Sequence, residues 1–330
     1  MSEHLLRLSR QNQQAQILYA HLLTHCDRLF SMEEIRGFAQ DCNLPLKDAC
    51  IALLSAACGL EPDTTPAHRQ LIDRYLSPAL SFSKSDRYRS NPYYRHIHFP
   101  EIKKGRWQMT HLSWQPGQLF PCGDPFILAD GREIQPLSCF EDDFSYPAVL
   151  EDGREWMTIT PNEIETMAAP IREAQGKTAV FGLGLGYFPF MISEKEAVSS
   201  VTIIERDHQI IDLFRAHLLP QFPRKEKIRI IAADAFDYMA GPMAEEAYDF
   251  AFIDLWHDVS DGLPLYLKCR RAELPGPRYQ YWIEKSLLLF LRQMLLDDIQ
   301  AECRPVPDAL ITLEGLHALA PTLAPEKFIL

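Results

Sequence analysis

The spacing of hydrophobic residues divides the chain into three regions, each with a different expected structure. In the first region apolar side chains recur at helical intervals, as in Leu5–Leu8 and Ile17–Leu23. The segment Ser31-Met-Glu-Glu34 has the pattern of a capping box, which precedes a helix. We therefore expect residues 1–80 to form a helical N-terminal region.

The second region, residues 81–157, has shorter apolar runs with many aromatic residues and prolines. Asp130-Gly131 and Asp152-Gly153 each lie between residues that favour strands. An Asp-Gly pair in that setting is typical of a tight hairpin turn. This part of the chain predicts a small antiparallel β region.

From residue 158 onward, apolar runs of strand length alternate with helical segments. Such alternation predicts a Rossmann-like α/β domain over residues 158–330, with a doubly wound, mostly parallel sheet. Thr160-Pro-Asn-Glu163 is a second capping box, and that helix should break or kink near Pro170. The strands are expected at residues 178–181, 201–204, 228–232, 248–253 and 280–283.

The end of the chain gives little sign of further strands. Residues 303–330 contain four prolines, at 305, 307, 321 and 325, and the only strand-like run is Ala309–Leu313. Proline removes a backbone donor and is rare inside sheets. The final strands of the domain are therefore expected to be missing, shortened or replaced.

Composition and charge exclude several classes of protein. The net charge of -12 argues against general nucleic-acid binding, which needs an excess of Lys and Arg. No membrane association is expected, because the most apolar segment, residues 286–296, is short and interrupted by Arg292. The first ten residues lack the apolar core of a secretory signal, so we expect a cytoplasmic protein.

The eight cysteines predict neither a metal site nor a disulfide framework. They form no C-x-x-C pair, and the spacing of Cys42, Cys50 and Cys58 fits no common zinc pattern. We expect reduced, mostly buried thiols.

Candidate chemistry follows the four predicted strand ends. A glycine loop follows the first strand, and acidic residues follow the next three. In an open α/β sheet, ligands bind beyond the carboxyl ends of the strands. Four polar features at those ends are stronger evidence for a binding site than one glycine loop. The candidate residues are Gly182, Gly184, Gly186, Glu205, Asp234, Ala235 and Asp254.

This array resembles the class I S-adenosylmethionine-dependent methyltransferase superfamily over residues 155–300. The resemblance implies that the three glycines contact the methionine and ribose parts of S-adenosylmethionine and that Glu205 holds the ribose hydroxyls. It further implies that Asp234 accepts a hydrogen bond from the adenine amino group, with Ala235 or Phe236 beside the ring. Asp254 would lie near the methionine moiety and the substrate.

NAD is the rival cofactor for a glycine loop of this kind. Its pyrophosphate prefers the sequence G-x-G-x-x-G, whereas Tyr187 and Phe188 follow Gly186 here. S-adenosylmethionine has no phosphate but carries an ammonium, a sulfonium and a diol, all of which suit carboxylates. The residues therefore favour S-adenosylmethionine.

The chain is similar to the spermidine-synthase-like branch of the superfamily. Like members of that branch, it lacks an acid two residues before the first glycine, where Val180 stands. Two positions differ from aminopropyltransferases: Leu185 replaces an Asp of the glycine loop, and His257 replaces the second Asp of the loop after strand four. The resemblance thus implies methyl transfer rather than aminopropyl transfer.

Three residues after the fourth strand are candidates for catalysis: Asp254, His257 and Asp258. The pKa of a free imidazole is near neutrality, so His257 is a candidate general base. The competing interpretation makes His257 a loop residue and Asp258 a helix cap.

Three functions remain open at this point. The first is methyl transfer to a small-molecule acceptor, the second a non-catalytic cofactor-binding or scaffold role, and the third aminopropyl transfer. The acceptor is not evident from the sequence, because fold does not determine substrate. The helical N-terminal region is compatible with a homodimer.

Overall fold

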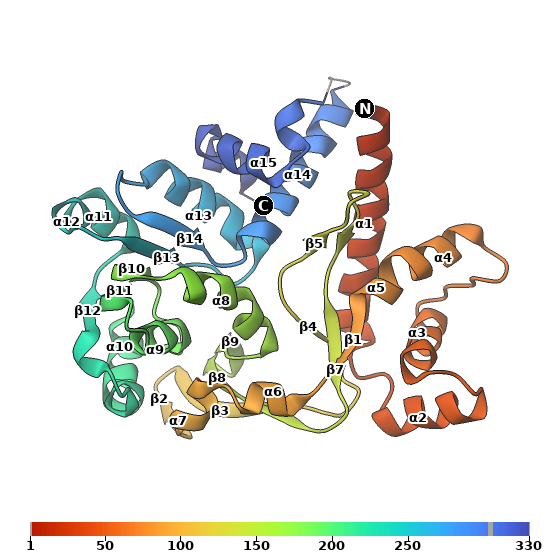
Figure 1. Ribbon diagram of the computed structural model, residues 1–330, viewed down its shortest axis with the longest axis horizontal. Helices are drawn as coiled ribbons and strands as arrows, with labels where there is room; N and C mark the ends of the chain where they lie inside the picture. The colour runs from red at the N-terminus through yellow and green to blue at the C-terminus, as the bar shows by residue number, and fades with distance from the viewer. Residues whose placement is uncertain (1, 303–305, 330) are drawn as a thin grey trace. The chain divides into compact units, whose positions relative to one another are not determined.

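The computed structural model describes residues 2–302 and 306–329, and these divide into two compact units (Figure 1). Unit 1 comprises Met1–Arg89, Leu112–Tyr146 and Leu296–Val306. Unit 2 comprises Ser90–His111, Pro147–Leu295 and Pro307–Leu330. The three-part division at residues 80 and 157 separates the chain by type of secondary structure and stays a prediction.

Unit 1 is built on the long helix α1, the red helix of Figure 1. The buried residues of unit 1 include Leu22, Ile35, Leu54 and Leu76, which belong to one apolar core. The capping box predicted at Ser31 is confirmed, since the Ser31 side chain accepts a hydrogen bond from the Glu34 N–H and the Glu34 side chain accepts one from the Ser31 N–H. The helices are α1 (Ser2–His25), α2 (Met32–Asp41), α3 (Leu46–Ala57), α4 (Pro66–Leu71), a π-helical turn (Ile72–Leu76), α5 (Ser77–Ala79) and α6 (Ser85–Arg89).

Short strands complete unit 1. β1 (Leu80–Ser83) pairs in parallel with β7 (Leu137–Phe140), which pairs antiparallel with β4 (Phe120–Pro121). β5 (Phe126–Ile127) and β6 (Glu133–Ile134) form an antiparallel pair.

Unit 2 contains a five-stranded parallel sheet with the order β12-β11-β10-β13-β14. The five strands predicted from the apolar runs are confirmed. They are β10 (Gly176–Phe181), β11 (Val198–Glu205), β12 (Ile228–Ala232), β13 (Phe250–Ile253) and β14 (Arg278–Tyr281). The strand order reverses between β10 and β13, so the fold is a Rossmann-like doubly wound α/β fold with its switch point beside the glycine loop.

Helices cover both faces of this sheet (Figure 1). α8 begins at the capping box formed by Thr160 and Glu163, as predicted, but it continues through Pro170 and does not break there. Unit 2 includes α7 (Pro92–His96), α8 (Pro161–Glu173), α9 (Tyr187–Ser193), α10 (His208–Leu213), a π-helical turn (Phe214–Leu218), α11 (Ala235–Ala240), α12 (Pro242–Glu245) and α13 (Val259–Ala272). α14 (Glu284–Ala301) begins in unit 2, and its residues from Leu296 onward belong to unit 1. α15 (Leu313–Leu319) lies in unit 2, as do the 3-10 turns at Leu219–Gln221, Lys225–Lys227, Asp308–Leu310, Ala320–Thr322 and Pro325–Phe328.

The predicted antiparallel β region is present as a sheet of order β2-β3-β8-β9. Its strands are β2 (Ile102–Lys104), β3 (Trp107–Trp114), β8 (Phe144–Glu151) and β9 (Arg154–Thr158). β2 pairs antiparallel with β3, and β8 with β9.

The C-terminal segment replaces strands with short helices. Residues 306–329 contain helix and turn, without a strand, and residues 303–305 lie outside the described part of the chain. The parallel sheet therefore has β14 at its edge. Among the described residues, no helix has both the length and the apolar character that crossing a membrane requires.

Candidate functional site

A cavity of about 870 Å³ lies in unit 2, at the carboxyl ends of the strands β10, β11, β12 and β13. The structure brings most of the predicted site residues together in its wall. Those that line it are Gly182, Gly184, Glu205, Asp234, Ala235, Asp254 and His257. Gly186 and Asp258 are not among the lining residues.

The three glycines of the loop have different physical roles. All have positive φ, and a Cβ on Gly182 would lie 2.0 Å from the carbonyl oxygen of Asp254. A Cβ on Gly186, which caps α9, would lie 2.4 Å from the Phe214 ring. A Cβ on Gly184 would meet nothing within 4 Å. Packing therefore requires glycine at positions 182 and 186, whereas Gly184 presents an open face on which a ligand can rest.

This difference gives a direct prediction. We expect Gly182→Ala to lower the free energy of unfolding by at least about 3 kcal/mol, because the methyl group would push apart the ends of β10 and β13. We expect Gly184→Ala to lower it by only about 1 kcal/mol, the strain of a side chain at positive φ. Thermal unfolding of the two variants measures the difference, and equal effects would contradict the assigned roles.

Glu205 is held by backbone donors on both sides. Its Oε2 accepts a hydrogen bond from the N–H of Leu183 at 3.1 Å, and its Oε1 accepts one from the N–H of Asp207 at 2.8 Å. A carboxylate has about four acceptor positions, so two remain after these bonds. Glu205 therefore fixes the glycine loop and still has acceptor capacity for a ligand.

Asp234 combines helix capping with a place in the cavity wall. Its Oδ1 accepts hydrogen bonds from the N–H groups of Phe236 at 2.8 Å and Asp237 at 3.2 Å, which caps α11. Its Oδ2 makes neither of these bonds. The side chain is exposed and the neighbouring Ala235 is buried. Oδ1 thus holds the carboxylate in place through the helix cap, while Oδ2 takes no part in the cap.

Asp254 has a strongly perturbed carboxyl group. It directly follows β13, and its N–H donates to the carbonyl of Phe181 at 2.9 Å. Burial, together with the negative charges of Glu163 and Glu205, raises the pKa of Asp254 to about 8. A cation that binds beside such a carboxyl group would lower its pKa and favour its charged form.

The structure adds lining carboxylates that the sequence did not suggest. Glu163 accepts a hydrogen bond from the N–H of Thr160 at 2.7 Å, as the capping box predicts, and it also lines the cavity. Burial raises the pKa of Glu163 despite that bond. Loss of hydration likewise raises the pKa of Glu155, another lining residue. In the sequence, Glu163 is explained completely by its role in the capping box. Its place in the cavity wall depends on how α8 packs.

Arg106 is a third lining residue that the sequence did not place at the site. One guanidinium nitrogen lies 2.9 Å from Glu151 Oε1, and the other lies 2.9 Å from Asp207 Oδ2. Asp207 also caps α10 through its Oδ1. Arg106 therefore pairs with two lining carboxylates and links β8 to the start of α10.

His257 and Asp258 differ in their relation to the cavity. His257 is exposed, its ring packs edge-on against Trp156 with 4.2 Å between centroids, and its Nδ1 lies 3.1 Å from Asp261 Oδ2. Asp258 Oδ1 accepts a hydrogen bond from the N–H of Ser260 at 2.7 Å and caps α13. The arrangement matches the helix-cap interpretation of Asp258, whose catalytic role stays a prediction.

The charge of the cavity wall follows from these residues. Seven carboxylates line it, at positions 151, 155, 163, 205, 207, 234 and 254, against the two arginines Arg106 and Arg206. Because Arg106 is already paired with two carboxylates, the remaining wall is negative. Such a wall favours a cationic ligand.

Known proteins give only remote comparisons. No protein-family model and no curated protein sequence matches the chain. Spermidine synthase from Thermotoga maritima is 16% identical, with 45% of this chain and 55% of that chain covered and a TM-score of 0.31. A putative methyltransferase of the S-adenosylmethionine-dependent class from Streptococcus mutans is 17% identical, with 54% and 50% covered and a TM-score of 0.32.

A third solved structure, the S-adenosylmethionine-dependent methyltransferase SibL in its apo form, is 16% identical, with 84% of this chain and 76% of that chain covered and a TM-score of 0.25. The chain spans about half the length of the first two structures. These three structures are described as a spermidine synthase and two methyltransferases. The fold of this chain is defined by the strand order of unit 2.

Proposed function

We propose that unit 2 binds S-adenosylmethionine and transfers its methyl group to a small-molecule acceptor. The observation that carries this proposal is the convergence of Glu205, Asp234 and Asp254, from three strand ends, on one cavity beside the open glycine loop. The cavity volume, about 870 Å³, is in the range of known ligand sites. Its negative wall suits a ligand that carries an ammonium and a sulfonium.

Each residue has a defined task in this proposal. Glu205, fixed by the N–H groups of Leu183 and Asp207, accepts hydrogen bonds from the ribose diol. Asp234 accepts one from the adenine amino group through Oδ2. Asp254 releases its proton when the cationic methionine part binds, and its carboxylate then orients that part. The cofactor supplies a methyl group on a positively charged sulfur, so positioning accounts for most of the catalysis.

The acceptor side of the cavity supports an amine as substrate. Glu155 and Glu163 line it from β9 and α8, and the cofactor assignment leaves both without a task. The pKa of each is raised, which makes it a better proton acceptor at neutral pH. A protonated amine would bind there, pass its proton to a carboxylate and attack the methyl carbon with its free lone pair.

Methyl transfer from labelled S-adenosylmethionine to paired acceptors tests this proposal. We expect turnover with small amines and none with carboxylic acids of the same size. Glu163→Gln retains a residue that closes a capping box, yet it should lower turnover by at least about tenfold. Because the charge of Glu163 also raises the pKa of Asp254, turnover is compared at saturating cofactor. Glu165→Gln, on the same helix but away from the lining residues, is the matched control.

Three results would contradict parts of this account. Equal turnover with the acids would contradict the amine as acceptor. Cofactor binding without turnover on any acceptor would favour the non-catalytic alternative. A preference for decarboxylated S-adenosylmethionine, with transfer of its aminopropyl group, would favour the third alternative.

A further inference from the structure

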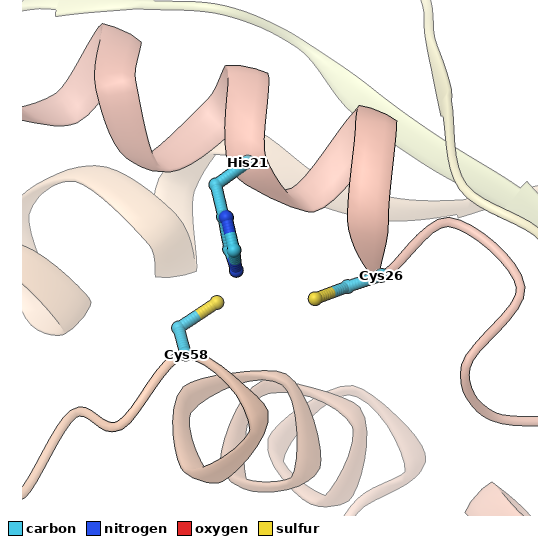
Figure 2. Close-up of side chains that lie close together, drawn as sticks. All are labelled: His21, Cys26 and Cys58. Atoms are coloured by element: carbon cyan, nitrogen blue, oxygen red, sulfur yellow. The ribbon is translucent and has the colours of Figure 1, made fainter.

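Two thiols and an imidazole meet in unit 1 (Figure 2). His21 lies in the last part of α1, Cys26 directly follows that helix, and Cys58 is the C-cap residue of α3. The ligand atoms of the three side chains all lie within 4.8 Å of one another. Figure 2 shows the tip of the imidazole directed between the two sulfur atoms. The helices bring together residues that are too far apart in sequence to form a recognisable motif.

The spacing of these atoms is close to that of a tetrahedral zinc site. Bond lengths of about 2.3 Å to sulfur and 2.0 Å to nitrogen place neighbouring ligand atoms roughly 3.5–3.8 Å apart. The three side chains reach that spacing with shifts of about 1 Å or less. Both cysteines are free thiols, and thiol with imidazole is the donor set that zinc prefers.

The surroundings of the three side chains protect the sulfurs and leave an entry path. Cys26 is 5% exposed and belongs to the apolar core of unit 1, and the half-buried Cys58 packs against that core. His21 is exposed. A cation can therefore approach from the imidazole side and bind against an apolar wall.

The ends of two helices meet at this cluster. α1 ends at His25 and α3 ends at Ala57. The three side chains are therefore held by two separate helices, both of which contribute to the apolar core of unit 1.

We propose that unit 1 binds a zinc ion through His21, Cys26 and Cys58, with water in the fourth position. Each thiol releases its proton to solvent as its sulfur binds the ion. The bound ion would join the C-terminal ends of α1 and α3. This proposal is independent of the one for unit 2, and either can fail without the other.

Metal titration of the full chain tests the site. Metal-free protein, kept reduced by a phosphine reductant, would first be titrated with Co²⁺ and then with Zn²⁺. Competition with a chromophoric chelator would measure the affinity for Zn²⁺. We expect one equivalent of Co²⁺ to give a thiolate-to-cobalt charge-transfer band and the strong visible bands of tetrahedral cobalt. Added Zn²⁺ should remove both.

Variants assign the ligands. Cys26→Ser and Cys58→Ser should each remove the contribution of one sulfur to the charge-transfer band. Each should also lower the affinity for zinc by at least about tenfold, and His21→Ala should lower that affinity similarly. His25→Ala and Cys42→Ser are matched controls. His25 is exposed on the same helix, its ring 5.0 Å from that of His21, and Cys42 is an exposed cysteine outside the cluster. Both should bind zinc as the wild type does.

The His21→Ala result is informative even if a cysteine variant fails to fold, because His21 is an exposed side chain. Absence of stoichiometric binding by the folded wild type would overturn the proposal. Zinc affinity unchanged in His21→Ala, or lost equally in His25→Ala, would overturn the assigned ligand set.

Discussion

Glu205→Ala is expected to weaken the binding of S-adenosylmethionine by at least about a hundredfold. Two hydrogen bonds from the ribose diol to a charged carboxylate contribute about 1.5–3 kcal/mol each. The substitution also removes the acceptor that holds the N–H groups of Leu183 and Asp207, so the glycine loop loses its anchor. Calorimetric titration of wild type and variant at one pH measures the loss.

The control for this variant is another acidic residue close to the site. Asp258→Ala removes the cap of α13 and should lower the free energy of unfolding by about 1 kcal/mol. Because Asp258 does not line the cavity, its removal should leave the affinity nearly unchanged. A folded Glu205→Ala protein that binds S-adenosylmethionine as tightly as the wild type would contradict the assignment of Glu205 to the ribose.

Asp254→Asn is expected to stabilise the ligand-free protein while it weakens cofactor binding. The ordinary pKa of this side chain is 3.8, and the fold raises it to about 8. The folded state therefore binds more protons than the unfolded state between these values, and the free energy of unfolding falls as pH rises from about 4 to 8. Asparagine carries no such charge, so at pH 8 it should stabilise unit 2 by about 1–3 kcal/mol.

The same carboxyl predicts a pH dependence of binding. Below pH 8 the free wild-type protein holds Asp254 mostly protonated, and a cationic ligand must displace that proton. Affinity should therefore rise with pH up to about 8 and then level off, with a proton released on binding. The Asp254→Asn variant should bind at least about tenfold more weakly and show a much smaller pH dependence.

Thermal unfolding across pH, and calorimetry in buffers of different ionisation enthalpy, measure these two effects. A destabilised Asp254→Asn protein would show that the carboxylate contributes a favourable contact in the free state. Binding that neither releases a proton nor responds to the substitution would remove Asp254 from the cofactor site.

The sequence predicted the sheet because its strands are buried apolar runs, and burial is what such runs encode. Once the strand ends were located, Glu205, Asp234 and Asp254 followed, since parallel strands bring their carboxyl ends to one edge. The order of the strands and the open space beside Gly184 depend on tertiary packing and were not predicted. The short helices at the end of the chain were not predicted either, because the prolines indicated only that strands are disfavoured there.

Residues whose position depends on packing between distant segments were not predicted. Glu163 has a complete local explanation as a capping residue, and its place in the cavity depends on how α8 lies against the sheet. Arg106 reaches Asp207 across a long stretch of chain. Cys26 and Cys58 meet only because α1 and α3 end side by side, and no local spacing records that.

Calorimetric titration of the purified wild-type protein with S-adenosylmethionine tests the central claim most directly. We predict saturable binding of one molecule per chain, with a dissociation constant on the order of micromolar to tens of micromolar and an affinity that increases from pH 6 to pH 8. A protein shown to be folded that takes up no S-adenosylmethionine across this range would contradict the account.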